Sequence, residues 1–196
     1  MLHGLHGWCD AEKADAIYDA ISADAARLAR PLYGLEIGVW AGRSLIPAAT
    51  ALRHSEHGGF VVGLDSYRNA DDMQGMEDTD HGKWRAPLNY EEFCVSALRL
   101  VESLSLGRWC GVFRASSADV SPLFGPLDYL HIDGAHGEEP SCRDVSLWVP
   151  KVRPGGIVIL DDTDWPTVAK ARAMLRERCD VEREAKTWDL LRAKGD

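Results

Sequence analysis

The chain has 196 residues, of which 45% are hydrophobic and 27% are charged, the balance of an ordinary soluble globular protein. Its formal net charge of −9 repels phosphate backbones and anionic lipids, so neither nucleic acid nor a membrane is expected as a partner. There is no apolar run long enough to span a bilayer, no signal-peptide pattern, and no C-x-x-C pair among the five cysteines. We expect a cytoplasmic protein with one domain over residues 1–196, and the sequence leaves a homodimer open.

The first expected element is an amphipathic helix from Asp10 to Arg30, with Asp10 as its N-cap and Pro31 ending it. Five short apolar runs follow, each typical of a strand covered on both faces. They cover residues 35–39, 60–64, 110–113, 127–132 and 156–160. The segments between them are long enough for crossover helices. The pattern therefore predicts an α/β fold with a parallel, doubly wound sheet.

Two segments depart from this alternation. Near the C-terminus, a last helix fits Pro166–Arg178, and residues 181–185 and 187–191 are short enough for a terminal pair of strands. The sheet is then seven-stranded and mostly parallel. The stretch Tyr67–Leu88 is polar, rich in Asp and Gly, and has no clear period. Because a long irregular loop inside a compact domain is usually functional or disordered, we interpret residues 67–88 as a lid over a binding site.

A cofactor signal follows the first strand. In the run Glu36–Ser44, Gly38 and Gly42 allow the backbone to approach a ligand, and the next helix presents free N–H groups to a carboxylate. Asp65 ends the second strand and can accept hydrogen bonds from ribose hydroxyls. The spacing E-x-G-x-x-x-G lacks the G-x-G-x-x-G of dinucleotide binders, and tight strand-to-helix turns also need glycine for structural reasons alone.

Three aspartates stand at neighbouring strand ends. Asp133 ends the fourth strand, and Asp161 and Asp162 end the fifth. Neighbouring strands lie ~4.8 Å apart, so these carboxylates converge and repel one another unless a cation or protons intervene. A hard ion such as Mg²⁺ or Mn²⁺ suits this all-oxygen set. In the alternative, Asp161 or Asp162 caps the following turn and Asp133 orders its loop.

These motifs resemble a known family. Residues 35–44 look like motif I of class I S-adenosylmethionine-dependent methyltransferases, and residues 131–136, 143–156 and 160–166 are similar to the small bacterial group called methyltransferase family 24. The resemblance implies a Rossmann-like fold with S-adenosylmethionine as cofactor. It also implies methyl transfer to a hydroxyl of a small molecule, a sugar or a natural-product intermediate.

The resemblance carries over a set of binding residues. Glu36 and Gly38 fall at the methionine end of the cofactor and Asp65 at its ribose. Ser116, Ser117 or Asp119 is assigned loosely to the adenine, and a helix cap is the alternative for Asp119. The whole expected cofactor set is Glu36, Gly38, Trp40, Gly42, Ser44, Asp65, Ser66, Ser117 and Asp133.

The acidic trio resembles the site of metal-dependent sugar O-methyltransferases, which implies that Asp133, Asp161 and Asp162 hold the ion and that Asp133 takes part in catalysis. Those enzymes have a second acid two residues after the strand-four aspartate, proposed as the general base, and this chain has Ala135 there. His136 is the nearest substitute, because histidine titrates near neutral pH. Its alternatives are to orient Asp133 or to ligate the ion.

Two rival functions remain. An NAD-dependent oxidoreductase shares the fold type, but the absent glycine pattern and the acidic cluster speak against it. A non-catalytic S-adenosylmethionine-binding module is supported only by Ala135 in place of an acid. Binding of S-adenosylhomocysteine or NAD separates the first from the expected function, and turnover separates the second.

Overall fold

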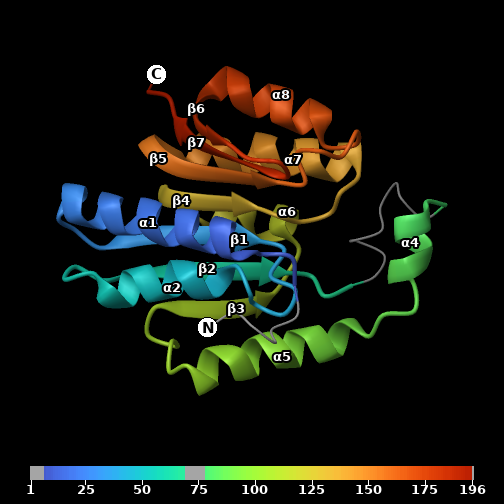
Figure 1. Ribbon diagram of the computed structural model, residues 1–196, viewed down its shortest axis with the longest axis horizontal. Helices are drawn as coiled ribbons and strands as arrows, with labels where there is room; N and C mark the ends of the chain where they lie inside the picture. Colours follow the sequence, from blue (N-terminus) through green and yellow to red (C-terminus); the bar gives the residue numbers. More distant parts are fainter. Residues whose placement is uncertain (1–6, 69–77, 196) are drawn as a thin grey trace.

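The computed structural model of the protein describes residues 7–68 and 78–195 (Figure 1). Within them, seven strands form one sheet in the order β3-β2-β1-β4-β5-β7-β6. The first five strands of that order pair in parallel, and β7 pairs antiparallel with both β5 and β6. The bounds are β1 Leu32–Ile37, β2 Gly59–Asp65, β3 Cys110–Arg114, β4 Leu127–Ile132, β5 Val152–Asp161, β6 Cys179–Glu184 and β7 Trp188–Ala193. The predicted Rossmann-like, mostly parallel seven-stranded sheet is confirmed.

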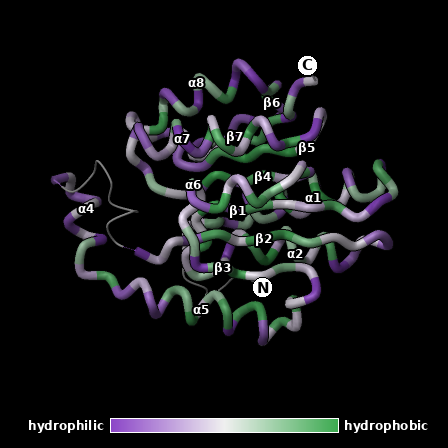
Figure 2. The backbone as a smooth tube through the Cα atoms, turned by 180° about the vertical axis from the view of Figure 1, so that it is seen from behind, coloured by the Kyte–Doolittle hydropathy of each residue, from purple (hydrophilic) through white to green (hydrophobic). Residues whose placement is uncertain are grey.

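Helices cover both faces of this sheet, which buries the central strands. On one face lie α1 (Ala11–Leu28), α2 (Leu45–His54) and α5 (Tyr90–Ser103), and on the other lie α7 (Glu138–Trp148) and α8 (Ala169–Arg178). Four short helical segments complete the described part: α4 Asp80–Arg85, α6 Ser117–Val120, η1 Ser121–Leu123 and η2 Val149–Lys151. Figure 2 shows hydrophobic colour along the central strands and hydrophilic colour on α8. None of the described helices has the length and apolarity to cross a membrane.

Helix α1 begins and ends where its local chemistry changes. The Asp10 side chain accepts a hydrogen bond from the Lys13 backbone N–H at 2.8 Å, which confirms Asp10 as the N-cap. The helix ends at Leu28, earlier than predicted, because Ala29 adopts a left-handed conformation and closes the last turn. Ile17 is fully buried on the stripe that packs against the sheet.

Other predicted boundaries also differ from the structure: β1 covers Leu32–Ile37 rather than 35–39, and β5 begins at Val152 rather than at residue 156. The last helix begins at Ala169 rather than at Pro166, after a short turn. In the predicted lid, residues 69–77 lie outside the described part, and residues 80–85 form the helix α4 where no regular element is predicted. The Thr79 hydroxyl caps this helix by accepting from the Gly82 N–H at 3.0 Å. In Figure 1, α4 lies beyond the arrowheads of the parallel strands.

The ends of β1, β2 and β4 are fixed to one another by backbone contacts at Gly38. Gly38 N–H donates to the Leu64 carbonyl at 2.8 Å, and Asp133 N–H donates to the Ile37 carbonyl at 2.9 Å. A Cβ atom at Gly38 would lie 1.8 Å from the Asp133 carbonyl oxygen, and the Gly38 φ is +85°. Only glycine fits both demands. The carboxyl ends of three strands therefore meet at a fixed point.

Candidate active site

A cavity of about 920 Å³ opens at the carboxyl ends of the parallel strands, where ligands of open α/β sheets bind. Its volume is at the upper end of the range for small-molecule sites. The predicted site residues that line it are Gly38, Trp40, Ser44, Asp65, Ser66, Ser117, Asp133, His136, Asp161 and Asp162. Two predicted cofactor residues, Glu36 and Gly42, are not part of its wall.

Glu36 and Gly42 support the turn after β1 from beneath. Glu36 is fully buried, and its Oε1 accepts a hydrogen bond from the Ser44 hydroxyl at 2.8 Å. Gly42 has a φ of +87°, and a Cβ there would meet Ala97 of α5 at 3.6 Å. Their positions fix the turn after β1 against the neighbouring elements.

Asp65 ties two loops together at the end of β2. Its Oδ2 accepts from the backbone N–H groups of Val39 and Trp40 at 3.0 and 2.9 Å, and its Oδ1 accepts from Tyr67 N–H at 2.8 Å. The Tyr67 hydroxyl donates to the Trp40 carbonyl at 2.9 Å. Trp40 and Tyr67 both have left-handed backbone, with φ of 50° and 48°. Such strain persists where surrounding bonds over-determine it, often at functional sites.

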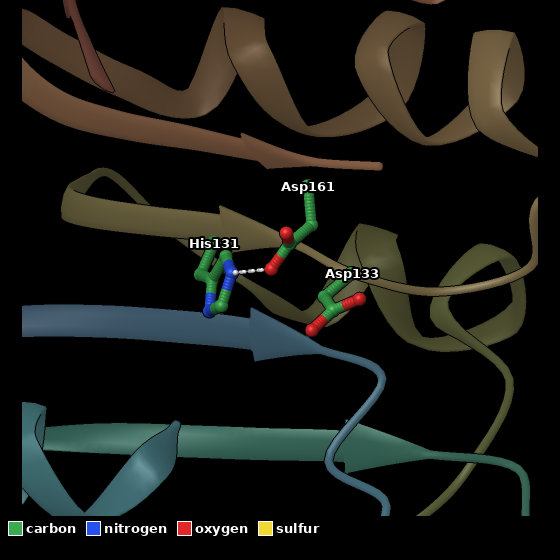
Figure 3. Close-up of side chains that lie close together, drawn as sticks. All are labelled: His131, Asp133 and Asp161. Carbon is green, nitrogen blue, oxygen red and sulfur yellow. Dashed lines mark hydrogen bonds and ion pairs between the residues drawn. The ribbon is translucent and has the colours of Figure 1, made fainter. Parts of the chain in front are cut away.

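A buried chain of charges runs below the cavity floor. The Lys13 ammonium is ion-paired with Asp161 Oδ2, which also lies 3.2 Å from His131 Nε2. His131 Nδ1 lies 3.4 Å from Glu36 Oε2. Figure 3 shows His131 and Asp161 facing each other with Asp133 beside them. Two cations and two anions from α1, β5, β4 and β1 thus neutralise one another.

The pKa values of these buried groups follow from the way they are paired. Burial alone lowers the pKa of the His131 imidazole, but the hydrogen bonds to Asp161 and Glu36 outweigh it and raise the pKa to about 10. Burial likewise opposes ionisation of Asp161, yet His131 and Lys13 hold the pKa of that carboxyl well below its usual range. Asp161 is therefore an anion with two permanent counter-ions.

The pKa of the Asp133 carboxyl is shifted in the opposite direction from that of Asp161. Desolvation raises the pKa of the Asp133 carboxyl well above its ordinary value, and the charge of Asp161 raises it further. Within residues 7–68 and 78–195, no cation is ion-paired with this carboxyl. The pKa of Asp133 is therefore raised although the charges of Lys13 and His131 act in the opposite direction, and Asp133 has no direct ion pair among the described residues.

A second group lies on the other side of Asp133. His136 Nε2 is 3.0 Å from Asp162 Oδ2, and His136 Nδ1 is buried without a hydrogen-bond partner among the described residues. Asp162 has a φ of 54°, a further strained position at this edge. One ligand atom from each of Asp133, His136 and Asp162 lies within 4.8 Å of the others, and the same holds for His131, Asp133 and Asp161. The predicted acidic trio is thus divided between two overlapping groups that share Asp133.

Three residues without a predicted role belong to this site: Lys13, His131 and Asp144. Asp144 of α7 lines the cavity and accepts a hydrogen bond from the Ser117 hydroxyl at 2.5 Å. Burial raises the pKa of the Asp144 carboxyl to about 6. Lys13 could have been singled out from the sequence, because it is a charged residue on the apolar face of α1, one turn before the buried Ile17.

Helix α4 and the chain start close one side of the cavity with aromatic rings. His81, Trp84 and Arg85 of α4 line it together with Trp8. The Trp8 and Trp84 ring centroids are 5.9 Å apart, and the Arg85 guanidinium lies 5.0 Å from the Trp40 ring centroid. The described part of the predicted lid therefore forms cavity wall.

Comparison with known proteins gives one family and many similar folds. A family model described as "Methyltransferase domain" matches residues 35–163. Among solved structures, the O-methyltransferase NovP is 20% identical with a TM-score of 0.73, over 94% of this chain and 80% of that one. An O-methyltransferase from Bacillus cereus in complex with SAH is 16% identical (TM-score 0.67, 98% and 84% covered). TomG from Streptomyces achromogenes, in complex with SAM, is 17% identical (TM-score 0.64, 95% and 81% covered).

Proposed function

The chain belongs to the methyltransferase-domain family, and from this premise we propose that it transfers the methyl group of S-adenosylmethionine to a hydroxyl of a small molecule, such as a sugar or a natural-product intermediate. The observation that carries the proposal is the cavity, which is lined by Gly38 at the end of β1 and by Asp133 and His136 after β4. The O-methyltransferases NovP and TomG have the same fold, and the structures from Bacillus cereus and of TomG hold SAH and SAM, which supports the cofactor and the acceptor class.

The residues of the β1 and β2 ends would bind the cofactor. Gly38 lines the cavity at the end of β1, and Asp65 and Ser66 line it at the end of β2. The Asp65 carboxylate accepts backbone hydrogen bonds from Val39, Trp40 and Tyr67, which hold it at the cavity wall where it would face the ribose. Ser117 and Asp144 would face the adenine. S-adenosylmethionine, when bound, supplies a methyl group on a positively charged sulfur.

His136 is the group that fits the role of general base. Because an ionised Asp162 can only accept, His136 Nε2 carries the proton of the 3.0 Å contact, which leaves Nδ1 as an acceptor. This Nδ1 is buried and has no partner among the described residues. His136 lines the cavity, and a hydroxyl that reached Nδ1 through a local opening of the cavity wall could donate its proton there. Asp162 would hold the imidazole in the tautomer that this requires.

The same edge suits a divalent cation. Asp133 has no counter-ion among the described residues, and its oxygen lies close to those of Asp162. Asp133 and Asp162 would therefore hold Mg²⁺ or Mn²⁺, which would make a nearby hydroxyl more acidic. Asp161 fits this role poorly, because Lys13, His131 and the Asp162 N–H already engage both of its oxygens.

Calorimetry and acceptor turnover test this function. S-adenosylhomocysteine should bind and raise the melting temperature, and NAD should do neither. His136→Ala should lower turnover by about 10²–10⁴-fold while S-adenosylhomocysteine binding is kept. His57→Ala, at an exposed histidine away from the cavity, is the matched control and should leave turnover unchanged.

A second variant separates the base from the ion. In the His136→Ala background, Ala135→Asp should recover part of the activity if the acceptor oxygen lies beside both positions. NAD binding without S-adenosylhomocysteine binding would overturn the proposed cofactor. Binding without turnover on any acceptor would indicate a non-catalytic module.

The setting in the cell is part of the proposal. The five cysteines are free thiols, as in a reducing compartment, which supports the predicted cytoplasmic location. The absence of nucleic-acid and membrane partners, the single domain over residues 1–196 and a homodimer stay predictions.

A further inference from the structure

Lys13 is a lysine placed where a hydrophobic residue is expected. It lies on the apolar face of α1, one turn before Ile17, and only 3% of it is exposed. Its ammonium is ion-paired with Asp161, and it lines the cavity. A buried charge is costly unless it is paired, so the position of Lys13 depends on the anions that it faces.

Asp161 is saturated by its partners. Oδ2 receives the Lys13 ammonium and the His131 Nε2–H, and Oδ1 receives the Asp162 N–H at 3.2 Å. Asp162, the next residue, is different: its carboxylate faces His136 and is partly exposed to the cavity. The two adjacent aspartates therefore have different partners: Asp161 is paired with Lys13 and His131, and Asp162 with His136 at the cavity wall.

We propose that Lys13 is a positioning residue whose ammonium occupies a cation position between Asp161 and Asp133, so that Asp161 is withheld from a divalent ion and ligation is left to Asp133 and Asp162. The proposal rests on the proposed function for the divalent ion at Asp133 and Asp162, and not for the methyl transfer itself. It adds a specificity that the acidic motif alone does not have. Lys13 of α1 thus determines which of the three carboxylates at this edge can bind a metal ion.

The consequence of removing the ammonium follows from charge. Without the ammonium, Asp161 keeps one cationic partner, His131. The Asp161 carboxylate then lies within 4.8 Å of the Asp133 carboxyl group with no ammonium to offset their repulsion. A hard divalent cation relieves such repulsion by binding both oxygens. Loss of Lys13 should therefore strengthen metal binding, whereas loss of a distant lysine should not.

Mn²⁺ binding to the full-length protein tests this, with neither cofactor nor acceptor present. The free Mn²⁺ signal in electron paramagnetic resonance gives the dissociation constant. Lys13→Met should bind Mn²⁺ at least about tenfold more tightly than the wild type. Lys13→Arg, which keeps the charge, should bind as the wild type does. Lys170→Met removes an exposed lysine paired with Glu138 on the surface and is the matched control, with no change expected.

A double variant identifies the ligand that Lys13 withholds. Lys13→Met/Asp161→Asn should lose the gain in Mn²⁺ affinity, because the released carboxylate is then absent. Asp161→Asn alone should change the wild-type affinity by less than about threefold, whereas Asp162→Asn should weaken any wild-type binding by more than about tenfold.

Folding is measured in the same series by circular dichroism. If Lys13→Met melts below the assay temperature, Mn²⁺ should raise its melting temperature more than that of the wild type, since the ion replaces the missing counter-charge. A variant that stays unfolded in Mn²⁺ overturns the proposal. So does a Lys13→Met affinity gain of less than about tenfold, or the same gain in Lys170→Met.

The outcome is separable from the proposed function. If the wild type binds no Mn²⁺ but Lys13→Met does, the ammonium takes the whole place of the metal, and only the divalent ion of the proposed function is lost. S-adenosylhomocysteine calorimetry on the wild type tests the methyl transfer proposal without reference to Lys13.

Discussion

Strand β4 has an aspartate near each end, and the two are in contrasting environments. Asp128, near the start, is 2% exposed and is held by Arg30 through two bonds of 2.7 and 3.0 Å, by Arg153 at 3.0 Å and by the Tyr33 N–H at 2.9 Å. Burial alone would raise the pKa of the Asp128 carboxyl, but these partners hold it below its usual value. Asp133, after the end of the strand, has no such partners in the described residues, and its pKa is raised.

The difference separates two uses of one residue type. At the amino end, every acceptor position of Asp128 is filled from within the protein, so the carboxylate fastens the segment after α1, β1 and β5 to β4. At the carboxyl end, Asp133 is left short of positive charge, which is what a site needs if it is to attract a cation or a proton. The cavity opens only at that second edge.

The largest expected effect concerns activity. Asp133→Asn should lower turnover by about 10²–10⁴-fold, because it removes the uncompensated carboxylate at the site. Asp128→Asn should leave turnover unchanged. Steady-state kinetics on both variants, with S-adenosylhomocysteine titrations to show that the cofactor pocket is kept, measure this contrast. Equal losses in the two variants would remove the distinction between the ends of β4.

A pH effect of about 3 kcal/mol is expected at Asp144, a second under-compensated carboxyl on the cavity edge. The pKa of Asp144 is about 6 in the folded protein against an ordinary value of 3.8, so between these pH values the folded state keeps a proton that the unfolded state has released. Its contribution to stability is therefore present below pH 3.8 and is lost as pH rises through 6.

Denaturant unfolding at several pH values checks that sign. Asp144→Asn should gain stability relative to the wild type as the pH rises through this window. Asp128→Asn should lose stability relative to the wild type as the pH rises towards 3.8 and should show no trend above it, because the pKa of Asp128 is lowered from 3.8 on folding. Parallel pH curves for the two variants would contradict the assignment of the two environments.

A smaller effect, about 2 kcal/mol of stability at neutral pH, is expected for Asp128→Asn. The arginine side chains are 38% and 37% exposed, so water screens part of their attraction and the cost stays below that of a wholly buried pair. Urea unfolding at neutral pH measures it. A loss below about 0.5 kcal/mol would show that Asp128 does not fasten the amino end.

The smallest effect compares one tyrosine at each edge. Tyr67→Phe removes the hydrogen bond to the Trp40 carbonyl and should cost about 1 kcal/mol of stability, with weaker S-adenosylhomocysteine binding because the left-handed Trp40 is then less restrained. Tyr33→Phe, at a side chain 51% exposed beside Asp128, is the control and should change neither quantity. Chemical denaturation and calorimetry give both values.

Much of the fold could be predicted because its strands are apolar runs buried on both faces. The residues that end those runs, such as Asp65 and Asp133, are the ones that topology brings to a common edge, so most of the cavity wall could be predicted too. The helix α4 could not, because six residues are too few to show a period, and its cap at Thr79 is a local contact.

The charge network could not be predicted from motifs, because its members come from four separate elements. His131 lies inside the apolar run of β4, and Lys13 lies on the apolar face of α1. Taken alone, each is a polar residue at a position where a hydrophobic one is expected. Their meaning depends on a contact between residues 148 positions apart in the chain. The division of labour between Asp161 and Asp162 follows from that contact and not from their adjacent positions.

The residues matched by the family model do not include every residue of the candidate site. The family match begins at Leu35 and ends at Thr163, whereas Lys13 precedes it and β7, which covers the edge of β5, follows it. A protein trimmed to the matched span would keep every acidic motif residue but lose the charge that governs one of them. Relatives that differ only in their first helix could therefore differ in metal requirement, and a survey restricted to the shared motif would miss why.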